Sequence, residues 1–489
     1  MKKSAYVAIA AAVAVAALVT FNTLRLGSRQ ISVGPSIQPP VDERGAAERL
    51  AGAVRFKTIS YETPSDSSHA ELLLLQSYLQ AAFPKAHAAA RREVINKYSL
   101  LYTWIGRDPS AKPIVLMAHQ DVVPIAPGTE ALWHTDPFSG EIKDGFIWGR
   151  GAWGDKGNLL AILEAVESLA GAGFRPERTV YLAFGHDEEN GGEEGAKAIA
   201  ALFRERGIRP EFVLDEGMLI TEGIMPGLDA PAALIGIGEK GWATLRLTAT
   251  ASPGHSSMPG SRTAIGALAA ALQRLDSNPF PAAIAGVARK MLYTLAPEMH
   301  GLNRVALSNL WLFEPLIRRQ LTQIPSANAL LRTTAAITVI RGGNKENVLP
   351  GEAEALVNFR LLPGETAAGV TAHARAVIGD PSIRIEVLPL SGEASPVASD
   401  SSAAYQLIAR TVRELFPNVV VAPGLMIGGT DSRHMLGLAD DVYRFSPVRA
   451  RADDLARFHG TDERISTANY VEIIRFYETL IRHAAGHRE

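Results

Sequence analysis

Three consecutive acidic residues lie in the segment 184–192, which reads FGHDEENGG. Asp187, Glu188 and Glu189 carry like charges that repel one another, and on an ordinary surface turn this repulsion lowers stability. A bound cation offsets such repulsion and gives carboxylates a chemical role as metal ligands. The segment therefore raises the hypothesis of a metal site, which needs further ligands elsewhere in the chain.

Further polar residues follow two apolar segments that read as buried strands. His119 and Asp121 come directly after 113–118 (PIVLMA), and Asp215 follows 211–214 (EFVL). A carboxylate that holds one imidazole nitrogen leaves the other nitrogen free to bind a metal. Taken alone, the pair is more simply a solvated histidine beside an aspartate in a loop, so its meaning depends on its neighbours.

Asp155 follows a glycine-rich segment, 149–154 (GRGAWG), that matches the dinucleotide-binding pattern G-x-G-x-x-G and opens a predicted helix. In a dinucleotide site a pyrophosphate occupies the N-terminus of that helix, where the carboxylate of Asp155 would repel it. A cation explains the glycines and the aspartate together, because Asp155 could then bridge two metal ions. The alternative for Asp155 alone is an ordinary helix cap.

The surrounding elements predict how these residues come together. Apolar strands alternate with amphipathic helices from about residue 41, which indicates an α/β fold with a doubly wound, mostly parallel sheet whose sites lie beyond the carboxyl ends of the strands. The polar residues follow those ends, and His459 supplies a second imidazole. Two histidines with several carboxylates suit zinc, and they exceed what one ion needs, so we expect a pair. The predicted strands are 113–118, 178–184 and 211–214, and the predicted helices are 159–169 and 193–206.

The pattern changes after Gly241. A strand, a helix, two strands, a helix and a strand follow in the order β-α-β-β-α-β, which predicts a small ferredoxin-like α/β sandwich. The stretch 279–332, between its first helix and second strand, reads as helical, and we expect it to build part of the substrate pocket or to cover an edge of the small domain. The predicted elements are 242–251, 263–275, 336–341, 353–361, 366–377 and 383–388, and a helix at 401–415 returns the chain to the first domain.

Length and composition narrow the class of protein. The chain has 489 residues, too many for one hydrophobic core, so we expect two domains. Its formal net charge is −2 and no basic stripe is visible, so we expect no nucleic-acid partner. The sequence contains no cysteine, which excludes a thiol nucleophile, a cysteine-ligated metal and disulfides.

The N-terminus carries an apolar run, 5–21, which two lysines precede and Arg25 and Arg29 follow. This arrangement is typical of a secretory signal peptide or of a single membrane anchor. No small-x-small cleavage site closes the run, which favours an uncleaved anchor. In either case we expect the rest of the chain outside the cytoplasm, membrane-anchored or secreted, and periplasmic in a bacterium. Residues 31–40 read as an extended linker.

In combination, the motifs resemble the dinuclear zinc metallopeptidases of the aminoacylase and carboxypeptidase G family (peptidase family M20), and most closely its carboxypeptidase S branch. The resemblance runs from residue 117 to 465. One departure is Asn190, where a branched apolar residue is more usual; it lies beside the site and is not a ligand. The matching segments are MAHQDVVP, WGRGAWGDKGN, FGHDEENGGEEGAK, VLDEG, GHSSMP, NVLPGEAEALVNFR, GGTDSRH and FHGTDERI.

The resemblance implies two zinc ions as cofactors, which Co²⁺ or Mn²⁺ could replace. It makes Glu188 the general base and Asp121 the residue that orients His119. A metal-bridging hydroxide would attack the amide carbonyl while Glu188 carries the proton. The implied ligands are His119, Asp155 and Asp215 for one ion, and Asp155, Glu189 and His459 for the other.

The implied reaction is hydrolysis of an amide bond next to a free α-carboxylate, as a carboxypeptidase, a dipeptidase or an N-acyl-amino-acid hydrolase. The partners would be small peptides or N-acyl amino acids, the membrane if the N-terminal segment is uncleaved, and a second subunit if a homodimer forms through the lid. His255, from the chain's own lid or a partner's, would stabilise the oxyanion. Arg360, Asn347 and the backbone of Gly428 and Gly429 would bind the carboxylate, although Arg360 is also readable as a structural residue.

The resemblance also makes the small sandwich a lid inserted into the catalytic domain. Two alternatives stay open. A serine hydrolase would use GHSSM at 254–258, although Met258 replaces the closing glycine of G-x-S-x-G. A membrane-tethered binding protein on a degenerate peptidase fold would be non-catalytic. The expected parts are a signal peptide or anchor (1–24), a linker (25–41), the catalytic domain (42–238 and 396–489) and the lid (239–395) with its helical insertion (279–332).

Overall fold

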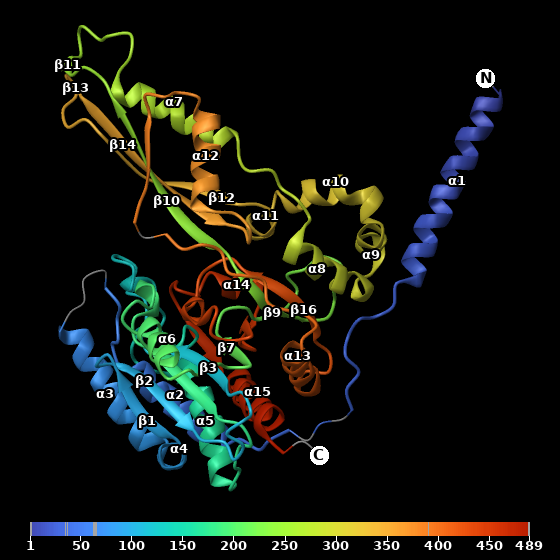
Figure 1. The fold of residues 1–489 in the computed structure, drawn as a ribbon, viewed down its shortest axis with the longest axis vertical. Coiled ribbons are helices and arrows are strands. Elements are labelled where there is room, and N and C mark those ends of the chain that lie inside the picture. Colours follow the sequence, from blue (N-terminus) through green and yellow to red (C-terminus); the bar gives the residue numbers. More distant parts are fainter. Residues whose placement is uncertain (1, 35, 37, 62–65, 390, 488–489) are drawn as a thin grey trace.

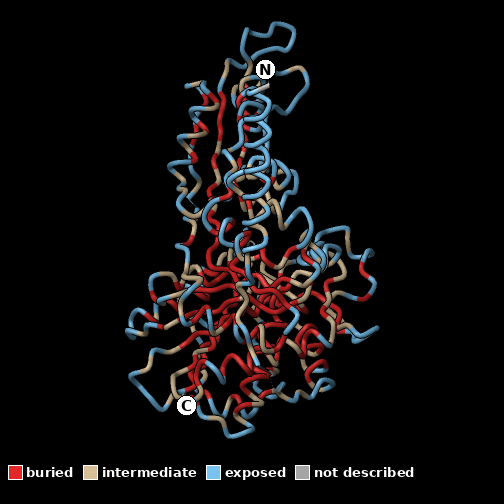
Figure 2. Tube along the Cα trace, turned by 90° about the vertical axis from the view of Figure 1, so that its right-hand side faces the viewer, coloured by how far each residue is buried: buried red, intermediate tan, exposed pale blue. Residues whose placement is uncertain are grey.

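The computed structural model describes residues 2–34, 36, 38–61, 66–389 and 391–487. Within these residues the chain forms two bodies, each built around its own sheet (Figure 1). The larger body holds a ten-stranded sheet, and the smaller body, which rises above it in the figure, holds a four-stranded sheet. Buried residues fill the larger body, whereas the N-terminal helix is exposed along most of its length (Figure 2).

The large sheet is parallel at its centre and contains both antiparallel and parallel pairs at its flanks. In spatial order its strands are β1 (Arg91–Ile95), β2 (Ser99–Trp104), β6 (Val180–Gly185), β3 (Ile114–His119), β7 (Phe212–Asp215), β17 (Asp441–Arg444), β9 (Ala232–Glu239), β8 (Ile220–Thr221) and β18 (Arg449–Ala450), with β16 (Val420–Met426) paired to β9. The three predicted strands are present as β3, β6 and β7. β6, β3, β7 and β17 run parallel, but β2 and β9 join them antiparallel. The sheet is therefore mixed, and the predicted parallel arrangement holds for its centre.

Helices cover both faces of this sheet because successive strand residues point to opposite sides. In β3, Ile114 and Leu116 belong to one core cluster, whereas Val115 and Met117 belong to another. All of β3 is buried, which explains its continuous apolar sequence. The first cluster is covered by α2 (Glu43–Val54), α3 (Asp66–Ala82), α4 (Pro84–Ala89), α5 (Lys156–Gly171), α13 (Ala403–Leu415) and α15 (Thr467–Ala485), and the second by α6 (Ala196–Glu205).

The small body has the predicted element order. It consists of β10 (Gly241–Thr250), α7 (Ala264–Ser277), β12 (Thr334–Gly342), β14 (Glu352–Leu361), α12 (Ala367–Ile378) and β15 (Arg384–Val387). Its strands lie in the order β12-β14-β10-β15, and all neighbours are antiparallel. Leu245 and Val357 are among the residues that pack against α7 and α12. Since β9 ends at Glu239 and β10 begins at Gly241, Lys240 alone separates the strands of the two bodies on this side.

The insertion at 279–332 is helical, as predicted. It forms α8 (Gly286–Leu295), α9 (Gly301–Ser308), α10 (Leu310–Leu321) and α11 (Pro325–Leu331). Leu292 and Leu295 of α8 share a core cluster with Leu234 of β9 and Ala422 of β16. The insertion therefore packs on the large body, because apolar side chains of the sheet in this region need cover.

The N-terminal apolar run forms α1 (Lys2–Arg25), which is long and apolar enough to cross a membrane. The segment that follows is extended, as predicted, and it is docked onto the large body. Gln30 Nε2 donates to the carbonyl of Val421 at 3.0 Å, and the N–H of Val421 donates to Gln30 Oε1 at 2.7 Å. Residues 35 and 37 of the predicted linker lie outside the described residues.

One buried ion pair joins two loops that carry predicted site residues. Oε1 of Glu463 accepts hydrogen bonds of 2.9–3.0 Å from three backbone N–H groups within 151–154, just before Asp155. Its Oε2 lies 2.5 Å from Nη1 of Arg150, whose Nη2 donates to the carbonyls of residues 459 and 460. Both side chains are buried. This pair therefore sets the position of both loops.

We expect Glu463→Gln to lower the free energy of unfolding by about 3–5 kcal/mol, because the guanidinium of Arg150 is left buried without a counter-charge. Unfolding in denaturant measures the change. As a control, Glu48→Gln removes a surface ion pair with Arg44 and should leave the midpoint unchanged. Equal midpoints for the two variants would show that the buried pair does not stabilise the loops.

Candidate active site

The predicted metal ligands gather at the carboxyl edge of the parallel strands. His119 is the last residue of β3, Asp215 is the last residue of β7, and β6 leads into a short 3-10 helix, η2 (Glu188–Asn190). Parallel neighbours end at the same edge of a sheet, which brings these residues together. Ligand atoms of His119, Glu188 and Glu189 lie within 4.8 Å of one another.

Asp121 fixes both the histidine and the acidic turn. Nδ1 of His119 lies 2.9 Å from the carbonyl of Asp121 and 3.2 Å from its Oδ1, which leaves Nε2 available as a ligand. The carboxylate also accepts hydrogen bonds from the N–H groups of Glu188 and Glu189 and from Oγ of Ser60. Burial alone would raise the pKa of Asp121, but the hydrogen bond and charge of His119 lower it below its usual range.

Asp155 lies at the start of α5 but does not cap it. Among the described residues its side chain makes no capping hydrogen bond, and Oδ2 instead accepts from the N–H of His119 at 3.2 Å. The carboxylate of Asp215 is held by the N–H groups of Glu216, at 2.9 Å, and Ser432, at 2.7 Å. The helix-cap alternative for Asp155 is therefore wrong, and its carboxylate faces the other acids.

His459, which is far along the chain from residues 187–189, lies next to this acidic turn. Its Nε2 lies 3.3 Å from Oε1 of Glu189, a buried oxygen for which the described residues provide no hydrogen-bond partner. The backbone φ of His459 is 58°, in the left-handed region that residues with a Cβ rarely adopt. Strained backbone of this kind is characteristic of functional sites, where the surrounding structure holds it in place.

Burial and mutual repulsion raise the pKa of several acids in this cluster. Burial is the largest cause for Glu188, whose pKa rises to about 8, and for Asp215. The pKa of Asp155 rises well above its usual range through burial and the charges of Asp215 and Glu189. A divalent cation would relieve this crowding, and a set of two imidazoles and several carboxylates fits a zinc-type site.

Two further acids of the cluster, one partly buried and one buried, were not predicted. Burial raises the pKa of Glu216, in the VLDEG segment, and of Asp431, in GGTDSRH, with added repulsion from Glu188 in both cases. Neither carboxylate oxygen of Asp431 has a hydrogen-bond partner among the described residues. Both motifs were recognised in the sequence, but only the tertiary structure shows that these two carboxylates join the cluster.

Arg433 was also missed, and it connects the acidic cluster to the base of the small body. Its Nη2 lies 3.6 Å from Oε1 of Glu188, and its Nε lies 3.9 Å from Oε1 of Glu239. Its guanidinium lies over the ring of Trp242 in β10, 4.7 Å from the centroid. Glu239 also pairs with the buried Arg444 at 3.1 Å. In the sequence, Arg433 was visible only as a positively charged residue of the GGTDSRH segment.

Two of the predicted substrate-binding segments lie near Arg433. Arg360 of β14 is the register partner of Trp242, and its pKa is lowered by burial and by the charge of Arg433. A Cβ added at Gly429 would lie 2.8 Å from Nη2 of Arg433, so the Gly428–Gly429 backbone runs directly past the guanidinium.

The other two substrate-binding candidates are not brought to the acidic cluster within one chain. His255 belongs to β11 (Gly254–His255), which pairs with β13 (Val348–Leu349) at the outer end of the small body (Figure 1). The carbonyl of Asn347, next to β13, accepts a hydrogen bond from Ser256 at 3.1 Å. His255 is exposed, and its Nδ1 lies 2.8 Å from Oγ of Ser257.

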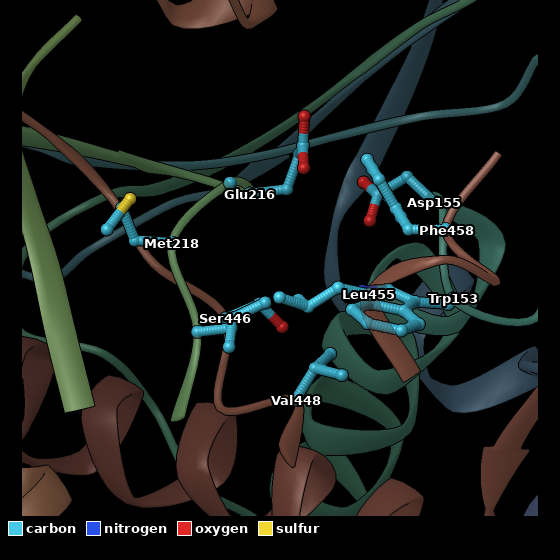
Figure 3. A pocket seen from close by; sticks show the side chains of 10 residues that line it. Trp153, Asp155, Glu216, Met218, Ser446, Val448, Leu455 and Phe458 are labelled. Carbon is cyan, nitrogen blue, oxygen red and sulfur yellow. The ribbon is translucent and has the colours of Figure 1, made fainter. Parts of the chain in front are cut away.

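A mainly apolar cavity of about 90 Å³ opens beside Asp155. Figure 3 shows the carboxylates of Asp155 and Glu216 on one side of it, with the side chains of Leu455 and Val448 on another. The cavity therefore places an apolar surface next to the predicted metal ligands. Its other lining residues include Trp153, Met218, Leu219, Ser446 and Phe458.

Comparison with solved structures shows the fold. Human carnosine dipeptidase 1 superposes with a TM-score of 0.64 at 18% identity, covering 90% of this chain and 96% of that one. The M20 family metallo-carboxypeptidase Sso-CP2 from Sulfolobus solfataricus gives a TM-score of 0.65 at 19% identity, covering 89% and 98%. Both comparisons extend over the large and the small body.

Comparison of sequences identifies the family. "Probable carboxypeptidase S-like 2" of Dictyostelium discoideum is 42% identical, covering 95% of this chain and 91% of that protein. "N-fatty-acyl-amino acid synthase/hydrolase PM20D1" of Mus musculus is 39% identical, covering 90% and 88%. The model of peptidase family M20/M25/M40 matches residues 115–483. This match covers most of the chain and includes all five proposed metal ligands. The chain therefore belongs to peptidase family M20/M25/M40.

Proposed function

We propose that the chain hydrolyses an amide bond next to a free α-carboxylate, in a small peptide or an N-acyl amino acid. The observation that carries this proposal is a cluster of buried acids and two imidazoles at one sheet edge, with Arg433 directly beside it. The relatives support both substrate types, since one is named a probable carboxypeptidase S-like protein and another an N-fatty-acyl-amino acid synthase/hydrolase.

The residues at the sheet edge fit a pair of divalent ions, for which we propose zinc. Oε1 of Glu189 is buried without a hydrogen bond from the described residues, and the pKa of Asp155 is raised; a bound cation would stabilise both carboxylates. When bound, the two ions would lower the pKa of a water molecule to about 7 and polarise the amide carbonyl. The proposed ligands are His119, Asp155 and Asp215 for one ion, and Asp155, Glu189 and His459 for the other.

Side chains of the protein then transfer the proton and position the groups that react. Glu188 accepts a proton from the attacking water and delivers it to the leaving amine, which is general base and then general acid catalysis. Asp121 keeps His119 in the tautomer that leaves Nε2 unprotonated. Arg433, 3.6 Å from Glu188, orients its carboxylate.

Substrate recognition follows from charge and from the cavity. The charge of Arg433 helps to lower the pKa of Arg360, and an anion between the two guanidinium groups would relieve that repulsion. We therefore assign the substrate carboxylate to these arginines and to the backbone of Gly428 and Gly429. His255 and Asn347 would reach the reacting groups from a lid, either after closure of the chain's own lid or from a partner subunit in a homodimer.

The apolar cavity beside Asp155 would take an apolar substituent of the substrate, on the acyl group or the side chain. Burying a few methylene groups there contributes roughly 0.8 kcal/mol for each. We assign the catalytic role to residues 42–238 and 396–489, and the lid to residues 239–395. The exposed position of GHSSM, at the outer end of the lid, gives no support to the serine-hydrolase alternative.

We also propose that the enzyme works outside the cytoplasm. α1 provides a signal segment or an anchor, and the two lysines before its apolar run favour a cytoplasmic N-terminus. The docked segment that follows α1 would then hold the catalytic body close to the point where the chain leaves the membrane.

Glu188→Gln should retain both metal ions and lose turnover by about 10²-fold or more, because the amide keeps the shape of the side chain but cannot accept the proton. Metal analysis and kcat on an N-acyl amino acid give the two readouts. Glu193→Gln, an exposed acid five residues later, is the matched control and should leave both unchanged. Near wild-type kcat in Glu188→Gln would mean that another group moves the proton.

Masking the substrate carboxylate as an amide should lower kcat/KM by a factor that corresponds to about 2–3 kcal/mol, because the arginines lose a charged partner. In Arg360→Ala the acid and its amide should become nearly equal. Arg341→Ala, on the exposed strand β12 of the same lid, should keep the full preference for the acid. Retention of that preference in Arg360→Ala would remove Arg360 from the substrate site.

The metal-free protein should lose stability as pH rises from about 4.5 to about 8. Between these values Glu188 keeps its proton in the folded chain but loses it in the unfolded chain, so unfolding becomes more favourable by up to ~1.4 kcal/mol per pH unit. Chemical denaturation at several pH values measures this slope. Zinc should abolish the loss of stability with rising pH, because it favours the ionised acids, and Glu188→Gln should make that loss smaller. A flat profile without metal would contradict the crowding of charge at the site.

A further inference from the structure

The helices α9 and α10 expose a concentration of large apolar side chains. Leu302 of α9 is 85% exposed, and in α10 Trp311 is 55% and Leu316 is 54% exposed. Leu312 is exposed as well, and it lies next to Leu316, since residues four positions apart are neighbours on the surface of a helix. The opposite face of α10 contributes Ile317 to the core cluster of the insertion. α10 is therefore apolar on both its buried and its exposed face.

α1 is fastened to these same helices by a buried asparagine. Asn309, between α9 and α10, is completely buried. Its Oδ1 accepts from Nδ2 of Asn22 at 3.0 Å, and its own Nδ2 lies 3.2 Å from the carbonyl of Val19 and from Oγ1 of Thr23. Just beyond α1, Arg304 of α9 donates to the carbonyl of Leu26 at 2.8 Å. The end of the candidate membrane span is thus part of the folded structure, and Figure 1 shows α9 and α10 beside it.

The chemistry of this surface suits the boundary of a bilayer. Tryptophan is enriched where an apolar ring meets polar head groups, and arginines near the end of a membrane span favour anionic lipid. Arg25 ends α1, and Arg319 follows the apolar residues on the exposed face of α10. A second copy of the chain would also cover apolar side chains, but the junction with α1 favours lipid, because a bilayer entered by α1 begins next to these helices.

We propose that α9 and α10 lie in the interfacial layer of the bilayer that α1 enters, with Leu302, Trp311, Leu312 and Leu316 inserted at the acyl boundary. The body is then held to the membrane at two adjacent places and has a fixed orientation. This inference rests on the membrane-anchor form of the proposed location. It assigns the helical insertion a role in membrane attachment that is separate from the chemistry at the sheet edge.

The absence of cysteine allows a direct test with single-cysteine variants of the full chain. Trp311→Cys and Leu316→Cys, each carrying an environment-sensitive fluorophore, are reconstituted into vesicles of phosphatidylcholine with phosphatidylserine. Val13→Cys reports on the anchor, and Ile105→Cys, 70% exposed and in the large body after β2, is the aqueous control. We expect spin-labelled lipid to quench the probes at 13, 311 and 316 severalfold more than the probe at 105.

Each pattern of quenching decides the question. Quenching at 13 but not at 311 or 316 overturns the inference and leaves the anchor intact. Quenching at 311 and 316 but not at 13 supports the lipid surface and rejects the anchor, and no quenching at any of the three rejects both. If the probes at 311 and 316 are shielded from aqueous iodide but not quenched by lipid, the face docks protein and the inference is wrong. Unchanged turnover of a soluble substrate in detergent confirms that the labelled chains are folded.

Discussion

Repulsion among carboxylates buried at one sheet edge is the constraint on which the rest of this structure depends. Buried acids are costly unless they are neutral, hydrogen-bonded or paired with a cation. Asp121 and Asp215 are satisfied largely by backbone N–H groups and hydroxyls, which fixes them in place. Asp155 and Glu189 lack such a set of donors among the described residues, which leaves their oxygens available for the proposed role as metal ligands. Asp121 thereby positions His119 and the acidic turn, whereas Asp215 is held in place and is itself a proposed metal ligand.

The sequence predicted the parts of the site that are local in the chain. His119 and Asp215 were predictable because a buried strand ends at each of them and parallel strands end together. The element order of the small body was likewise visible in alternating and helical patterns. The antiparallel pairing of β2 with β6 and of β9 with β17 could not be predicted in this way. The apolar sequence of a buried strand is the same whether its neighbours run parallel or antiparallel to it.

What the sequence did not show depends on contacts between distant segments. Arg433 lies far along the chain from Glu188, and nothing in their spacing indicates that they approach to 3.6 Å. The surface on which the helical insertion packs could not be predicted either. An amphipathic pattern shows that one face of a helix is buried, but it does not show which element covers that face. Arg433 also contacts Glu239 and Trp242, on either side of the crossing between the two sheets, so a change in the angle between the two bodies would act directly on a residue beside the proposed base.

The ion pair between Arg150 and Glu463 joins two loops that each carry a ligand of the two proposed ion positions. The carboxylate holds the loop that leads to Asp155, and the guanidinium holds the carbonyl of His459. Occupation of one ion position would order that shared frame and reduce the entropy lost at the next. The two positions would then fill cooperatively, and the protein would pass between empty and fully loaded states with little of the singly loaded form in between.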